Sequence, residues 1–237
     1  MALGCNIWNM GFYACFIAYP LIYKPMVKEN STVKRITIAS VVSAVVALQL
    51  GAFSVVLQTK LSGISELPFS KFLMLMQPIH LAIGIVEGFV TAGVVNYIRS
   101  VEPALVEHRA TGGGFRKAVI ALSILAVITG GVLSWFASTH PDGLEWSIKN
   151  IYGKTELDST PSGIKTEFQK IQEKTALMPD YSFPSSDDES GSDAWPAPDP
   201  GTTVSGLVGG AVVLAVVVLF GVVLFKWKKK SYSHVKR

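Results

Sequence analysis

Apolar residues along the chain are gathered in five long blocks, which shorter polar segments separate. A helix needs about 20 apolar residues to cross the hydrocarbon layer of a membrane, and each block reaches that length. The pattern therefore predicts an all-α, polytopic membrane protein with about five transmembrane helices. The blocks run approximately over Leu3–Tyr23, Ile36–Leu57, Phe72–Ile98, Lys117–Ala137 and Gly206–Phe225.

The first and last blocks differ most in regularity. The first contains Asn6, Asn9 and Pro20, but neighbouring helices can satisfy polar groups and a broken backbone inside a membrane. The block that starts at Gly206 contains apolar residues alone. It is typical of a lipid-facing anchor helix.

The charged residues between the blocks orient the chain. Basic residues outnumber acidic ones in three of the polar segments. The counts are four basic against one acidic in residues 24–35, four against two in residues 99–117, and six against none in residues 226–237. Residues 138–205 instead carry five lysines against twelve acidic residues. Because basic loops are retained in the cytoplasm, we expect the amino terminus outside and the carboxyl terminus in the cytoplasm.

The segment after the fourth block divides by composition. Residues 138–178 contain the string PDGLE and apolar residues at the spacing of short amphipathic helices, so a small extracytoplasmic element is predicted. Residues 179–205 are rich in Pro, Ser and Asp, which is typical of an exposed acidic linker. Residues 1–137 then form the membrane helices, and residues 206–237 form the anchor helix with a basic tail.

The overall composition agrees with this picture, since 49% of the residues are hydrophobic and only 16% are charged. The net charge of +4 could suggest nucleic acid. However, the basic residues lie at the ends of the apolar blocks, where they orient a protein in the lipid bilayer, so no nucleic-acid partner is expected. The chain shows no Ser/His/Asp nucleophile set, no HExxH motif and no complete phosphate-binding loop, so it is not expected to be an enzyme.

Polar residues interrupt the third block in the string QPIHLAIGIVEG. Gln77, His80, Gly84 and Glu87 follow spacings of three, four and three, and so line one face of the predicted helix. A charged carboxylate near the bilayer centre costs roughly 3 kcal/mol on insertion scales. Such a face must therefore contact protein or water.

Two interpretations of this face compete. Imidazole and carboxylate groups suit Ni, Co or Zn, so His80 and Glu87 could bind a divalent cation. They lie about two helical turns, or roughly 10 Å, apart along the axis, which is too far to share one ion directly. We therefore favour a buried polar face, formed by Gln77, His80 and Glu87, that packs against other helices or couples to another subunit.

His140 precedes the string PDGLE and could capture a metal weakly together with the nearby acids. A helix start explains the same residues, with Pro141 at the first position and acids in the first turn. We favour the helix start and assign no metal ligand here. The expected accessory element consists of Asp142, Gly143, Leu144 and Glu145.

The strings LGCNIWNMGFYACFIAYPLIY and LQLGAFSVVLQTKLSGISELPFSKFLMLMQPIHLAIGIVEGFVTAGVV lie in the first three blocks, and PDGLEWSI follows the fourth. The first two resemble the carboxyl-terminal half of the substrate-binding membrane component of nickel/cobalt energy-coupling factor transporters, the CbiM/NikM type. The third resembles the NikN-like PDGLE extension of that family. The resemblance implies uptake of Ni²⁺ or Co²⁺ across the cell membrane of a prokaryote. It also implies a coupling transmembrane subunit and ATP-hydrolysing subunits as partners.

The chain departs from that family at the metal-binding residues. The family grips its metal mainly through an amino-terminal Met-His and a further histidine in an upstream loop, whereas Ala2 follows Met1 here and that loop is absent. No family ligand is therefore assigned, no tightly bound cofactor is expected, and Ni²⁺ or Co²⁺ enters only as the transported ion.

Because the chain resembles the carboxyl-terminal part of a longer protein, two hypotheses follow from the sequence. One is a membrane component, whole or partial, of the metal transporter. The other is a truncated, non-transporting membrane interaction protein that lacks the metal-binding amino terminus.

Overall fold

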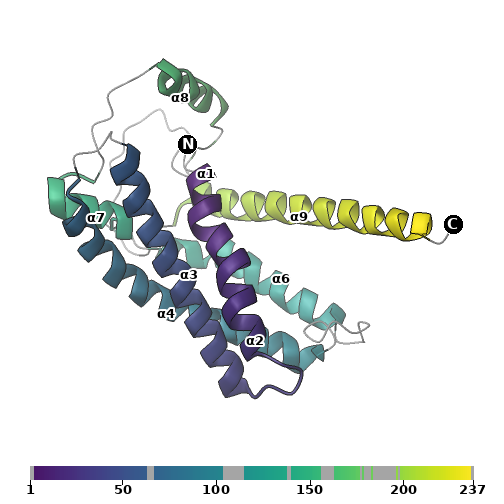
Figure 1. Cartoon of the computed structure of the whole chain (residues 1–237). Coiled ribbons are helices and arrows are strands. Elements are labelled where there is room, and N and C mark those ends of the chain that lie inside the picture. The colour runs from purple at the N-terminus through teal and green to yellow at the C-terminus, as the bar shows by residue number, and fades with distance from the viewer. Residues whose placement is uncertain are drawn as a thin grey trace. The chain divides into compact units, whose positions relative to one another are not determined.

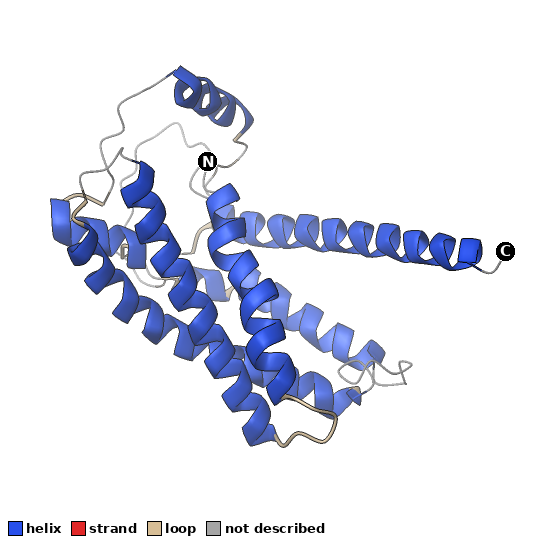
Figure 2. Cartoon of the chain, viewed as in Figure 1, coloured by secondary structure: helices blue, strands red, loops and turns tan. Residues whose placement is uncertain are grey.

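The computed structural model describes most of the chain. The described residues are 3–62, 67–103, 115–137, 140–155, 163–176 and 198–235, together with 178, 183 and 196. In this described part the secondary structure is helical throughout, without a strand (Figure 2). The predicted all-α class is therefore confirmed.

Ten helical elements occupy the described part of the chain (Figure 1). They are α1 (Leu3–Asn6), η1 (Ile7–Tyr23), α2 (Lys24–Met26), α3 (Val33–Ser62), α4 (Phe69–Val101), α6 (Phe115–Gly131), η2 (Leu133–Phe136), α7 (Gly143–Tyr152), α8 (Gly163–Thr175) and α9 (Pro200–Val235).

Three of the described helices are long and apolar enough to cross a membrane, namely Val33–Ser62, Phe69–Val101 and Pro200–Trp227. The predicted blocks at Leu3 and Lys117 are helical too, but η1 and α6 have only 17 residues each. Five membrane helices, and the orientation across the membrane, therefore remain predictions.

The chain divides into two compact units. Unit 1 combines Met1–Ala118 with His140–Lys170, and unit 2 combines Val119–Thr139 with Ile171–Arg237. Unit 1 contains η1, α3, α4 and α7, and it holds the candidate site.

Helices α3 and α4 of unit 1 approach each other closely because glycines lie on the contact face of α4. A Cβ atom added at Gly84 would lie 2.9 Å from the Cα of Val45, and one added at Gly88 would lie 2.5 Å from the Cα of Val41. Small residues let membrane helices meet backbone to backbone, where dispersion forces hold them together. The glycines of the third predicted block thus explain the close approach of α3 and α4.

Amide side chains connect the helices of unit 1. Gln49 Nε2 donates to the backbone oxygen of Gln77 at 2.8 Å, and Gln77 Nε2 donates to that of Gln49 at 3.3 Å. The side chains of Asn9 in η1 and Gln58 in α3 donate to each other, both at 3.2 Å. Polar groups without a partner are costly in lipid, so these pairs stabilise the helix contacts.

The first predicted block forms a helix throughout, but Ile7–Tyr23 adopts the wider π-helical winding. The sequence pattern does not indicate this winding. Gly51 of α3 lets the two backbones meet, because a Cβ atom there would overlap the backbone oxygen of Asn9. The asparagine that made the block irregular is therefore a buried contact residue.

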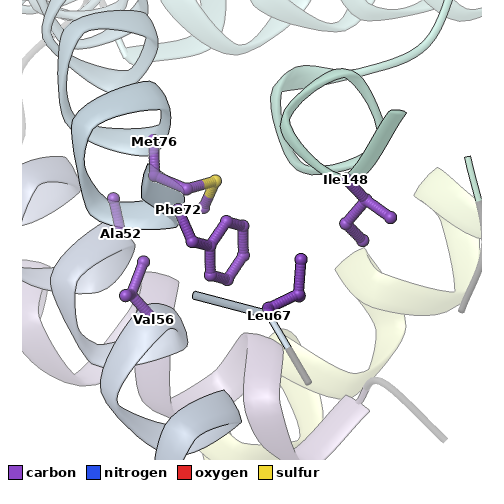
Figure 3. Close-up of a cluster of buried hydrophobic side chains, with 6 residues drawn as sticks. All are labelled: Ala52, Val56, Leu67, Phe72, Met76 and Ile148. Carbon is purple, nitrogen blue, oxygen red and sulfur yellow. The ribbon is translucent and has the colours of Figure 1, made fainter. Parts of the chain in front are cut away.

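A cluster of buried apolar side chains lies where α3, α4 and α7 meet (Figure 3). The short α7 contributes Ile148, whose side chain lies opposite those of Leu67 and Phe72. This packing fixes the PDGLE segment to the membrane helices. The members of the cluster are Ala52, Val56, Leu67, Phe72, Met76 and Ile148.

In unit 2, α9 meets the end of α6 at small and hydroxyl-bearing residues. A Cβ atom at Gly206 would lie 2.8 Å from the backbone oxygen of Gly130. Thr203 Oγ1 donates to the backbone oxygen of Gly131 at 2.9 Å and accepts from Trp135 Nε1 at 2.8 Å. None of the apolar window of α9 is buried, as a lipid-facing anchor requires.

Helix α9 begins at Pro200, six residues before the predicted anchor. Asp199 caps its start, because Oδ1 accepts from the backbone N–H of Gly201 at 2.8 Å, and Pro200 suits the first helical position. The predicted linker, residues 179–205, therefore ends earlier than expected. Most of its acidic part lies outside the described residues.

Candidate functional site

A cavity of about 1180 Å³ lies within unit 1 and is lined by η1, α3, α4 and the start of α7. Small and apolar side chains form most of its wall, and polar side chains are distributed among them. The polar lining includes Asn9, Ser40, Ser43, Gln58, His80, Glu87, Thr91 and Asp142.

The predicted polar face of α4 reaches this cavity only in part. His80 and Glu87 line it, whereas Gln77 is engaged with Gln49 of α3. Gln77 and His80 are half-buried and Glu87 is exposed, so the expected burial is not found at Glu87. Helix α3 packs against Gly84 and Gly88 of α4, and Glu87 lies beside this contact, where it lines the cavity.

The imidazole of His80 is held in one tautomer. Its Nδ1 atom lies 2.8 Å from the backbone oxygen of Met76. A carbonyl oxygen can only accept, so Nδ1 carries a proton, and the lone pair of the corresponding imidazole tautomer is on Nε2. No hydrogen bond joins Nε2 to any residue that the structure describes.

Gly143, the glycine of the PDGLE string, rests directly on α4. A Cβ atom there would lie 2.8 Å from Cγ2 of Ile79 and 3.4 Å from Cε1 of His80. Because a larger residue would collide with Ile79, glycine is what allows α7 to start this close to the membrane helix. The sequence-predicted polar face and the accessory element are therefore in contact.

The acids of the PDGLE string form a capping box at the start of α7. Asp142 Oδ1 accepts from the backbone N–H groups of Leu144 and Glu145, both at 2.8 Å, and Glu145 Oε2 accepts from the backbone N–H of Asp142 at 3.3 Å. The predicted helix start is confirmed, with a correction. Pro141 precedes the cap, and Gly143 takes the first helical position.

Within the described residues, no three His, Cys, Asp or Glu side chains lie close enough together to hold a metal ion. That His80 and Glu87 share no ion stays a prediction from their spacing along the helix. His140, the other histidine weighed as a ligand, is exposed. Both cysteines, Cys5 and Cys15, are exposed as well and unbridged.

Two known protein families match the two parts of the chain that line the cavity. Residues 1–105 match the cobalt uptake substrate-specific transmembrane region, CbiM, and residues 116–226 match the PDGLE domain. The chain is a CbiM–PDGLE fusion. CbiM regions are membrane components of nickel and cobalt transport systems, and the family is not one of enzymes.

A relative of this fusion occurs in Archaeoglobus fulgidus and is named provisionally as a fused nickel transport protein, NikMN. It is 29% identical over 215 residues, which cover 90% of the CbiM–PDGLE fusion and 62% of the archaeal protein. The present chain thus spans less than two thirds of that relative's length. No solved structure matches the chain.

The two matched regions meet at the cavity. The CbiM match includes η1, α3 and α4, which form most of the lining, and the PDGLE match includes α7, which contributes Asp142, Gly143 and Leu144. The PDGLE match also begins at residue 116 and so includes α6, which the sequence placed with the CbiM-type helices.

Sequence reasoning missed the contribution of α3 to the cavity. Ser40, Ser43 and Gln58 line it, and the buried Ser43 Oγ has no hydrogen-bond partner among the described residues. A signal was available, since small and polar residues recur at spacings of three and four through the second block and the residue that follows it. They are Ser40, Ser43, Ala47, Gly51, Ser54 and Gln58.

Proposed function

We propose that the chain is a membrane component, whole or partial, of an energy-coupling factor transporter that takes up Ni²⁺ or Co²⁺ into a prokaryotic cell. The observation that carries this proposal is the docking of the PDGLE helix on the CbiM-type helices. Gly143 rests on His80, and both residues line one cavity. An accessory element that serves metal loading requires such a contact with the transport helices.

Each residue of the polar face has its own role in this proposal. Gln77 packs α4 against α3 through its reciprocal bonds with Gln49. His80 couples α4 to the PDGLE element through its contact with Gly143. Glu87 keeps a carboxylate at the cavity, where water, cargo or a partner helix covers it.

ATP hydrolysis belongs to partner subunits in this proposal, and a coupling transmembrane subunit connects them to the chain. The carboxyl-terminal end of α4, which lies away from α7, has features that suit contact with the coupling subunit. Arg99 donates to the backbone oxygen of Ser31 at 2.6 Å and to that of Glu29, so it fixes the loop between α2 and α3. The exposed basic residue Lys28 lies in this loop and the exposed Arg35 lies in the first turn of α3, which suits a rigid cytoplasmic docking end.

The proposal is tested by metal accumulation in cells that express the chain together with the coupling and ATP-hydrolysing subunits. Radioactive nickel and cobalt should accumulate above the level of cells that carry an empty vector. Accumulation at the empty-vector level, with the assembled complex isolated from the same membranes, would refute transport by this chain.

The second candidate function is a non-transporting membrane interaction protein. The observation that favours it is that no three His, Cys, Asp or Glu side chains among the described residues are grouped to hold a metal ion. This candidate predicts that the chain still assembles with its partner subunits while metal accumulation stays at the control level, so the same experiment separates the two.

A further inference from the structure

The charge of the cavity wall is one-sided. The chain as a whole has 21 basic against 17 acidic residues. Yet the charged side chains among the described lining residues are Glu87 and Asp142, both acidic, and none of the lining is Lys or Arg. A cleft with charges of one sign and low-dielectric walls focuses the field and concentrates ions of opposite sign. The cavity is therefore suited to cations.

His80 offers this cavity a metal ligand. Its proton is held on Nδ1 by the backbone oxygen of Met76 at 2.8 Å, which leaves the Nε2 lone pair available. Metal-binding histidines commonly donate their second ring N–H to a backbone carbonyl in this way, because the bond fixes the tautomer and orients the ring. The imidazole of His80 is thus already oriented for metal binding through Nε2.

We propose that His80 binds the incoming divalent cation through Nε2 at the α7 side of the cavity, as a single imidazole in an open site whose other ligands are water. This inference rests on the proposed function, since it takes Ni²⁺ or Co²⁺ as the cargo. It is distinct from a shared site between His80 and Glu87, which the helix spacing excludes.

An open site of this kind suits transport. Within the described residues no group of three His, Cys, Asp or Glu side chains closes around the ion, so the ion bound to His80 stays exchangeable. Glu87 lies roughly 10 Å further along α4 by helix geometry, on the side away from α7. An ion that leaves His80 therefore stays inside an acidic cavity.

The ligand chemistry also sets selectivity. Imidazole binds Ni²⁺ and Co²⁺ well, whereas Mg²⁺ prefers oxygen ligands and retains its water. Mg²⁺ in excess should therefore leave binding of Co²⁺ to His80 unchanged.

The test uses the full chain, purified and reconstituted in lipid nanodiscs, with cobalt chloride as the only added metal. Diethyl pyrocarbonate modifies a histidine at its free ring nitrogen, and peptide mass spectrometry reports each histidine separately. Cobalt should slow the modification of His80 by about tenfold or more, while the exposed His140 should react at an unchanged rate. Magnesium chloride at the same concentration serves as the metal control.

The substitution His80→Asn gives a second readout, because the asparagine amide can still donate to Met76. Calorimetric affinity for Co²⁺ should fall by about tenfold or more, while His140→Asn should leave it unchanged. Equal modification of wild-type His80 with cobalt and with magnesium would overturn the inference, as would a His80 that the reagent never reaches. The modification rates of wild-type His80 test the inference even if His80→Asn fails to fold.

The two proposals fail separately. If cells accumulate metal but cobalt leaves His80 unprotected, the His80 site is wrong and the transport function stands. If cobalt protects His80 but the assembled complex accumulates no metal, the transport function is wrong and the binding site stands.

Discussion

Replacing Gly143 by valine is expected to loosen α7 from α4. A Cβ atom at this position would lie 2.8 Å from Cγ2 of Ile79, and valine adds two further methyl groups beside His80. Forcing extra methyl groups into a packed contact costs about 1–3 kcal/mol. Alanine should cost less, because it adds the Cβ atom alone.

This penalty acts on the docked state of α7, because the exposed N-terminal residues of the undocked helix have room for the new side chain. An energy of 1–3 kcal/mol corresponds to a change of about 5- to 150-fold in the ratio of docked to undocked helix. The anchoring contacts of Ile148 and the buried Ser147 would be lost whenever α7 undocks.

Hydrogen–deuterium exchange with mass spectrometry measures this ratio through the amides of α7. Gly143→Val should accelerate their exchange by up to the same factor, while Gly209→Ala, a glycine of α9 with open space around it, should leave them unchanged. Wild-type protection of α7 in Gly143→Val would refute the claim that this glycine is required for docking.

Three further substitutions test the packing and the cap. Gly88→Ala should cost about 1–3 kcal/mol and so lower the thermal unfolding temperature in detergent. Gly93→Ala on the same helix should leave that temperature unchanged, because the space around Gly93 is open. Equal effects of the two substitutions would contradict the close approach of α3 and α4. Asn9→Leu should destabilise the fold by about 0.6–1.7 kcal/mol, because it removes the amide pair with Gln58. In a double-mutant cycle, adding Gln58→Leu should recover part of that loss. Strict additivity of the two substitutions would show that the amide pair contributes nothing. Asp142→Ala should lower the stability of α7 by about 1 kcal/mol, which is measured as faster exchange of its amides. Asp142→Asn should keep most of the stability of α7, because asparagine also caps helices. An equal loss in both variants would contradict the capping role.

The hydrophobic pattern predicted the helical elements well because membrane helices satisfy their own backbone and depend little on distant residues. The start of α7 was predictable for a similar reason, since the PDGLE acids bond within their own turn. The start of α9 was misplaced because the pattern counts apolar residues, whereas the helix begins where Asp199 caps it.

The site was predictable only in its parts. Helical spacing placed His80 and Glu87 on one face, but it could not show which neighbour covers that face. That answer depends on Gly84 and Gly88, which bring α3 against one side of α4 and leave Glu87 exposed to the cavity. The contact between Gly143 and His80 joins residues more than 60 positions apart, so no local pattern reports it.

The most direct test of the central claim is ATP-driven cobalt uptake into lipid vesicles that contain the chain with its coupling and ATP-hydrolysing subunits. The account predicts uptake that requires ATP and falls when Gly143→Val loosens the PDGLE helix, while Gly209→Ala transports normally. Vesicles that hold the assembled complex, hydrolyse ATP and yet take up no cobalt would contradict it.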